Sequence, residues 1–107
     1  MTLFDDRERA FEAKFRGDQE TAFRIAVRRD KLLGLWAAEE LGLSGDAAKA
    51  YAQAVVAAGL ERHDARGKVV GDLLARGIVL AETTVRLRHD VLHERAREQV
   101  FAESAAG

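Results

Sequence analysis

The chain has 107 residues, 33% of them charged, with no cysteine, no proline and a formal net charge of −1. A chain of this length fits one domain with a single modest core. The small net charge argues against broad electrostatic binding to nucleic acid or to an anionic membrane. The lack of cysteine excludes disulfides and thiolate metal sites, and no run is apolar and long enough to span a membrane. We therefore expect a cytoplasmic protein that does not insert into the membrane.

Residues 2–16 predict an amphipathic helix with one aromatic stripe. Phe4, Phe11 and Phe15 stand at spacings of seven and four, which places them on one helix face. Acid-first charge pairs at i,i+4 support helicity on the other faces, but a helix of this length is marginal in water by itself. Gly17 follows as a hinge or cap. The stripe either packs on this chain's own helices or belongs to a loose arm that binds in a partner's groove, and the residues alone favour neither.

Glycine must mark most helix ends in a chain without proline. Four glycines stand where helical patterns end, namely Gly17, Gly42, Gly59 and Gly77. They predict four further helices, over residues 18–41, 44–58, 64–76 and 82–103. Asp18 and Ser44 are the expected N-caps of the first two. We expect an all-α, four-helix bundle-like domain over residues 18–107, preceded by a separate N-terminal segment over residues 1–17.

Apolar residues recur at helical spacing along each bundle helix, which predicts one buried stripe per helix. The predicted stripes comprise Ala22, Ala26, Leu33, Trp36 and Ala37, with Phe23 and Leu32 beside them; Ala48, Tyr51, Ala52 and Val55; Val69, Val70, Leu73 and Leu74; and Val85, Leu92, Ala96 and Val100. Gly34 and the Gly67/Gly71 pair are expected to allow close approach of helices.

One basic helix face is a candidate binding site for a small ligand. Arg24, Arg28 and Lys31 share this face, close in sequence to Trp36. Such a face can hold a phosphate or nucleotide, or dock on an acidic partner, although a solvated face is the ordinary explanation. Weak adenine-nucleotide binding here is the only cofactor-like binding that the sequence suggests.

The sequence offers no group of residues suited to catalysis. It contains no P-loop, no GxSxG and no serine with a nearby histidine. His89 and His93 stand four residues apart, as two metal ligands could, but their context is not HExxH and a structural role is the better interpretation. We therefore expect no metal, no catalytic residue and no enzyme activity.

Two blocks of the sequence resemble the zeta-type ATPase inhibitor subunit of α-proteobacterial rotary ATP synthases. The first block is FDDRERAFEAKF at residues 4–15, and the second is Phe23-Arg24 followed by RRDKLLGLWAA at residues 28–38. Weaker matches follow at residues 45–46, 50–52, 68–69, 72–73 and 96–100. The resemblance therefore covers almost the whole chain.

The resemblance implies a four-helix regulatory protein with a mobile N-terminal inhibitory arm over residues 1–17. This arm would be disordered or frayed when free and would fold as a helix inside a catalytic interface of the ATPase head. There the arm would block ATP hydrolysis, while synthesis could still expel it. The implied partners are the alpha, beta and gamma subunits of the F-type ATP synthase, which would hold this bacterial protein peripheral to the inner membrane; the free protein is expected to be a monomer. Phe4, Phe11 and Phe15 would be buried anchors. Charged arm residues would set register and complementarity, namely Asp5, Asp6, Arg7, Glu8, Arg9, Glu12 and Lys14.

Four positions depart from the family pattern. Gly17 is expected to make the arm easier to unfold, and Gly67 to loosen the third bundle helix. His89 stands on a core stripe where an apolar residue is expected, and Asp30 stands where asparagine is expected.

Two alternative functions stay open. One is a small nucleotide-binding helical sensor, with a crevice near Trp36, Tyr51 and the arginine face. The other is a structural interaction or dimerisation protein, in which the phenylalanine stripe forms a coiled-coil seam.

Overall fold

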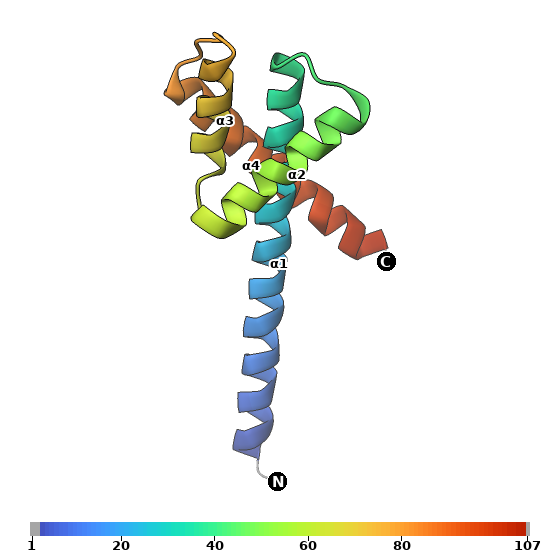
Figure 1. Ribbon diagram of the computed structural model, residues 1–107. Coiled ribbons are helices and arrows are strands. Elements are labelled where there is room, and N and C mark those ends of the chain that lie inside the picture. The colour runs from blue at the N-terminus through green and yellow to red at the C-terminus, as the bar shows by residue number, and fades with distance from the viewer. Residues whose placement is uncertain (1–2, 107) are drawn as a thin grey trace.

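Four helices, and no strand, make up the part of the chain that the computed structural model describes, residues 3–106. They are α1 (Leu3–Glu40), α2 (Gly45–Arg62), α3 (Ala65–Ala75) and α4 (Glu82–Ala106). The C-terminal half of α1 packs against α2 and α4, and its N-terminal half projects from the bundle as a stalk (Figure 1). None of these helices is both long enough and apolar enough to cross a membrane. The predicted all-α, four-helix fold is confirmed.

The first helix is continuous, so the predicted break at Gly17 and the predicted N-cap at Asp18 are wrong. Both residues lie inside α1, which has 38 residues. One glycine inside a helix costs about 1 kcal/mol, which a long helix with favourable neighbours on both sides can absorb. A Cβ at Gly17 would meet no atom within 4 Å, so packing does not require glycine here.

The second helix also runs past its predicted end at Gly59. It continues to Arg62 and stops at His63, which adopts the left-handed conformation with φ of 55°. The amides of His63 and Asp64 donate to the carbonyls of Gly59 (3.1 Å) and Ala58 (3.3 Å). This pair of bonds is the usual way of satisfying the last carbonyls of a helix, so the stop signal lies four residues beyond the glycine.

Other predicted helix ends are confirmed. Gly42 and Gly77 have φ of 76° and 77° in the turns that follow α1 and α3. Ser44 is the N-cap of α2. Asp64 is the N-cap of α3 and accepts a hydrogen bond from the amide of Gly67 (3.0 Å). A Cβ at Gly67 would collide with the Asp64 carboxylate, so glycine at this position makes room for the cap. The prediction that Gly67 loosens α3 stays a prediction.

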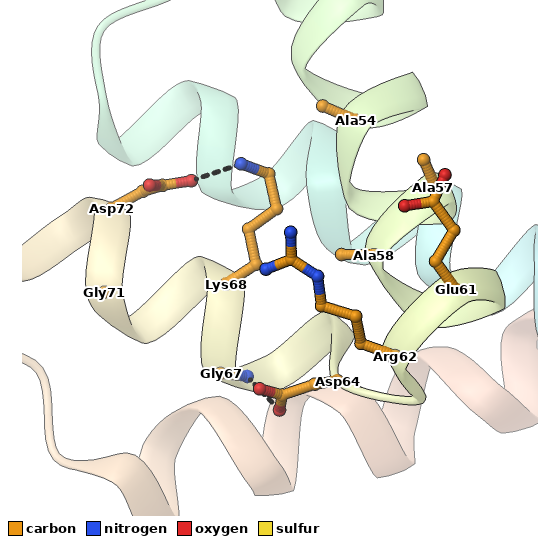
Figure 2. A pocket seen from close by; sticks show the side chains of 10 residues that line it. All are labelled: Ala54, Ala57, Ala58, Glu61, Arg62, Asp64, Gly67, Lys68, Gly71 and Asp72. Atoms are coloured by element: carbon orange, nitrogen blue, oxygen red, sulfur yellow. Dashed lines mark hydrogen bonds and ion pairs between the residues drawn. The ribbon is translucent and has the colours of Figure 1, made fainter.

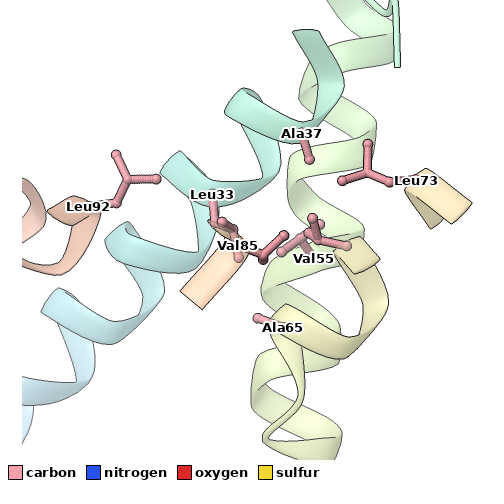
Figure 3. Packing of buried hydrophobic residues seen from close by; sticks show 8 residues of the cluster. Leu33, Ala37, Val55, Ala65, Leu73, Val85 and Leu92 are labelled. Carbon is pink, nitrogen blue, oxygen red and sulfur yellow. The ribbon is translucent and has the colours of Figure 1, made fainter. Parts of the chain in front are cut away.

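The core lies where the four helices converge, as Figure 3 shows. It contains eight buried residues: Leu33, Ala37, Val55, Ala65, Val69, Leu73, Val85 and Leu92. A smaller cluster of Ile25, Ala96 and Val100 joins α1 to the C-terminal half of α4. The predicted stripe of α4 is therefore buried throughout, because α4 crosses α1 along that face.

Three predicted core residues are exposed. Ala22 and Phe23 lie outside the bundle, since Ile25 is the first buried residue of α1 among those described. Leu74 is exposed because α3 packs through the face that carries Val69 and Leu73.

Close helix approach is confirmed at Gly34 and is wrong at Gly71. A Cβ at Gly34 would lie 2.6 Å from the Cα of Ala52 and 3.1 Å from the Cβ of Val55, so α1 and α2 touch here through backbone. A Cβ at Gly71 would meet nothing within 4 Å. The contact at Gly34 fixes the position of α1, and thereby the direction of its projecting half.

Candidate partner-binding surface

The projecting half of α1 is solvated on all sides. Every residue from 5 to 20 is exposed, and Thr21 is the first that is half-buried. At 1.5 Å per residue, the helix from Leu3 to Glu20 reaches about 27 Å beyond the bundle. We call residues 3–17 the described part of the arm. It has no contact surface within its own bundle that could bury an apolar face.

An aromatic stripe lies on this arm. Phe11 is 71% exposed and Phe15 is 56% exposed. The backbone of Phe4 belongs to α1, but its side chain lies outside the described part of the structure. Large apolar groups in water are unfavourable at about 25 cal/mol per Å², and clustered exposed ones mark binding surfaces. Of the two interpretations of the stripe, packing on the chain's own helices is therefore wrong for Phe11 and Phe15.

The junction between arm and bundle combines two features that weaken a helix. Gly17 has poor helix propensity. The hydroxyl of Thr21 donates to the carbonyl of Gly17 (2.9 Å), a local bond that competes with the helix ladder and is often found at bends. The prediction that the arm frays when free stays a prediction.

The base of the arm is held by ion pairs to the C-terminal end of α4. Arg28 lies 2.7 Å from a carboxylate oxygen of Glu103 and donates to Gln99 (2.9 Å). Arg24 contacts Glu103 (3.7 Å) and the hydroxyl of Ser104 (3.4 Å). Such partly exposed pairs contribute up to about 1 kcal/mol each. They fix the angle between α1 and α4 at the point where the arm leaves the bundle.

These ion pairs bear on the candidate anion site. Arg24 and Arg28 face Glu103, so an anion would have to compete with that carboxylate. Lys31 is exposed on α1. Trp36 instead packs against the core, with the guanidinium of Arg88 5.5 Å from its ring centroid. Arg24 and Arg28 therefore lie together around Glu103. The cation beside Trp36 is Arg88, which is not part of the predicted basic face.

A buried polar pair, which sequence reasoning missed, joins α1 to α4. His89 Nε2 lies 2.8 Å from Asp30 Oδ1, and the Nε of Arg29 donates to the same oxygen (2.9 Å). Asp30 is 5% exposed and His89 9% exposed. The other carboxylate oxygen of Asp30 occupies the space that a Cβ at Gly59 would fill. The two departures from the family pattern at Asp30 and His89 are thus partners of one another.

Asp30 is charged in the folded protein. Burial by itself raises the pKa of its carboxyl, but the hydrogen bonds from His89 and Arg29 outweigh burial and hold the pKa below its usual value. Burial also raises the pKa of Tyr51, and its hydrogen bond to Asp72 (2.9 Å) adds to that rise.

His93, which stands four residues after His89 in the sequence, is exposed on α4. The described residues contain no group of three acidic or histidine side chains suited to a metal.

A pocket of 460 Å³ lies between α2 and α3 (Figure 2). Its charged groups largely satisfy one another, since Lys68 Nζ lies 3.0 Å from Asp72 and Asp64 caps α3. Glu61 and Arg62 add one charge of each sign at its rim. The pocket therefore offers a mixed, nearly neutral lining and no set of like groups directed at a ligand.

A small helical bundle that carries a long exposed helix with an aromatic stripe is built to bind another protein. The sequence pattern of one family matches residues 1–99, and the chain belongs to that family, the ATPase inhibitor subunit zeta. No curated protein matches the chain at a significant level. Family membership confirms the predicted resemblance and implies that the chain binds F-type ATP synthase, inhibits its ATP hydrolysis and is not itself an enzyme.

Proposed function

We propose that the chain inhibits ATP hydrolysis by inserting residues 1–17 as a helix into a catalytic interface of the ATP synthase head. The alpha, beta and gamma subunits form that interface, and the bundle of residues 18–107 stays outside it. The inserted arm acts as a wedge that stops rotation in the hydrolysis direction, whereas rotation in the synthesis direction expels it. The protein is then cytoplasmic and peripheral to the membrane through its partner.

The observation that carries this proposal is the exposure of Phe11 and Phe15 on the arm. Burying a phenylalanine side chain stabilises a complex by about 1.5–3 kcal/mol. Two such side chains supply about 3–6 kcal/mol, and aromatic anchors in pockets dominate many interfaces. A wedge of this kind needs no catalytic group. It is enough that the arm binds in the cleft with a free energy larger than the free energy that closure of the cleft supplies to displace it.

A helix that already exists loses less conformational freedom on binding than a disordered segment does. Fixing a residue's backbone costs about 1–2 kcal/mol, so helix formed before binding reduces that cost. Continuity of α1 with the bundle supports a partly preformed arm, because the packed half of α1 supplies the nucleus that an isolated helix of this length lacks.

The test is an ATP hydrolysis assay with the isolated head of the cognate ATP synthase and the full-length chain added during turnover. Wild-type chain should inhibit, and the double variant Phe11→Ala, Phe15→Ala should lose inhibition by a factor of about 100 or more. The matched control is Phe23→Ala on the same helix. Phe23 and Phe15 are both 56% exposed, but Phe23 lies beyond the arm.

The control variant should inhibit as wild type does. All three chains should give the same unfolding midpoint in urea, since none of the three phenylalanines is buried in the bundle. Full inhibition by the double variant, or an equal loss from Phe23→Ala, would contradict insertion of the arm.

A further inference from the structure

Charges of opposite sign flank the two sides of the aromatic stripe. With about 100° per residue, Phe11 and Phe15 lie about 40° apart around the axis of α1. Arg7 and Lys14 lie about 60–80° to one side of the midline between the two phenylalanines. Glu8 and Glu12 fall about 40–80° to the other side. All six residues are exposed on the helix.

The sidedness has definite limits. Arg9, Arg16 and Glu20 lie more than about 100° from the midline and face away from the stripe. Asp18 lies on the basic side but one turn nearer to the bundle, so the pattern covers residues 7–14. Glu8 and Glu12 are like charges at i,i+4, a spacing that slightly destabilises a free helix. No ion pair with a described residue compensates either carboxylate.

We infer that the arm binds a groove whose floor is apolar and whose two rims carry opposite charge. The rim beside Arg7 and Lys14 is acidic, and the rim beside Glu8 and Glu12 is basic. This inference rests on the proposed function and names the chemistry of the surface that the arm meets. The basic rim also relieves the repulsion between Glu8 and Glu12, neither of which forms an ion pair with another described residue.

Opposite rims also fix the orientation of the helix. A helix laid in the groove with its ends exchanged would place each row of charges against a rim of the same sign. Like charges brought together at an interface oppose binding strongly. The phenylalanines therefore supply affinity, and the two charged rows select one direction and one rotation of the helix.

The test exchanges charges without changing the net charge of −1. The flank variant combines Glu12→Lys with Lys14→Glu and so reverses one position on each side of the stripe. The control variant combines Arg95→Glu with Glu98→Lys, two exposed residues of α4 that lie outside the arm. Both are measured as full-length chains in the hydrolysis assay, at low and at high salt, with helicity checked by circular dichroism.

The flank variant should need about tenfold more protein for half-inhibition at low salt, mainly through slower association. The difference should shrink at high salt, where surface charges are screened. The control variant should stay within about twofold of wild type. Equal behaviour of the two variants would overturn the inference.

Phe11→Ala in the same assay separates the two claims. If Phe11→Ala loses inhibition while the flank variant matches its control, the arm inserts but the rims are not oppositely charged. If wild-type chain and Phe11→Ala behave alike, the proposed function itself fails, and the inference fails with it.

Discussion

The pair formed by Asp30 and His89 holds α1 on α4, and breaking it should weaken the whole bundle. Replacing His89 by leucine suits the apolar stripe of α4 but leaves the buried carboxylate of Asp30 with Arg29 alone. A hydrogen bond to a charged group contributes about 1.5–3 kcal/mol, and its length of 2.8 Å is typical of a strong one. His89→Leu should therefore lower the free energy of unfolding by about 2–3 kcal/mol.

A double-mutant cycle isolates this interaction from general repacking. Asp30→Asn alone should cost about 1–2 kcal/mol, because a neutral amide still accepts a bond from His89. In the His89→Leu background, Asp30→Asn should cost little or even stabilise, since an amide with Arg29 as its one remaining partner is easier to bury than a carboxylate with that one partner. The expected coupling energy is about 1–2 kcal/mol.

Urea unfolding at pH 7, followed by the fluorescence of Trp36, the only tryptophan, gives the four free energies. A loss of 1 kcal/mol corresponds to a fall of about 4–8 °C in Tm for a domain of this size. Inhibition per folded molecule should be unchanged, because the pair is remote from the arm. A coupling energy below about 0.5 kcal/mol would refute the idea that the two residues stabilise each other.

Three further outcomes follow from the same structure. Because folding lowers the pKa of Asp30, its carboxylate contributes stability above the unfolded pKa of about 3.9. That contribution is lost as the pH falls through the lower pKa of the folded state. Asp30→Asn should therefore flatten the acid side of a curve of unfolding free energy against pH, measured by urea unfolding. Gly17→Ala should raise arm helicity, seen as slower amide exchange, and lower the half-inhibitory concentration about twofold to fivefold, because alanine favours helix by about 0.5–1 kcal/mol and meets nothing at this position. Gly34→Ala should instead destabilise the bundle by about 1–3 kcal/mol in thermal unfolding, because its Cβ would be forced against Ala52.

The fold class and the aromatic stripe could be predicted because both are local patterns. Helical spacing of apolar residues fixes which face of α4 is buried, and the same spacing aligns Phe11 with Phe15. Exposure of the stripe could not be predicted, because an apolar face looks the same in sequence whether a partner or the chain itself covers it. The free end of α1 becomes visible only once Ile25 is seen to be its first buried residue.

Composition could not predict that α1 and α2 continue through Gly17 and Gly59. A single glycine costs about as much as one cap contributes, so neighbouring residues decide whether the helix stops. The partner of Asp30 is 59 residues away in the chain. A contact at that separation depends on the crossing of α1 and α4, which no local pattern encodes. The ion pair between Arg28 and Glu103 also joins α1 to α4, so the sequence could not predict it for the same reason.

The bundle is much thicker than the rod that leaves it, and this difference limits how far the protein can enter a slot. A single helix with its side chains is about 10–12 Å across, whereas the two shorter dimensions of the whole molecule are 27 and 21 Å. On the proposed insertion, the bundle is too wide to follow the arm and forms a collar, so the number of residues between this collar and Phe11 sets the depth that the Phe11 ring reaches. Seven residues inserted after Gly17 would add about 10 Å of shaft, and a cross-link from the tip would report whether the collar or the floor of the slot ends the insertion.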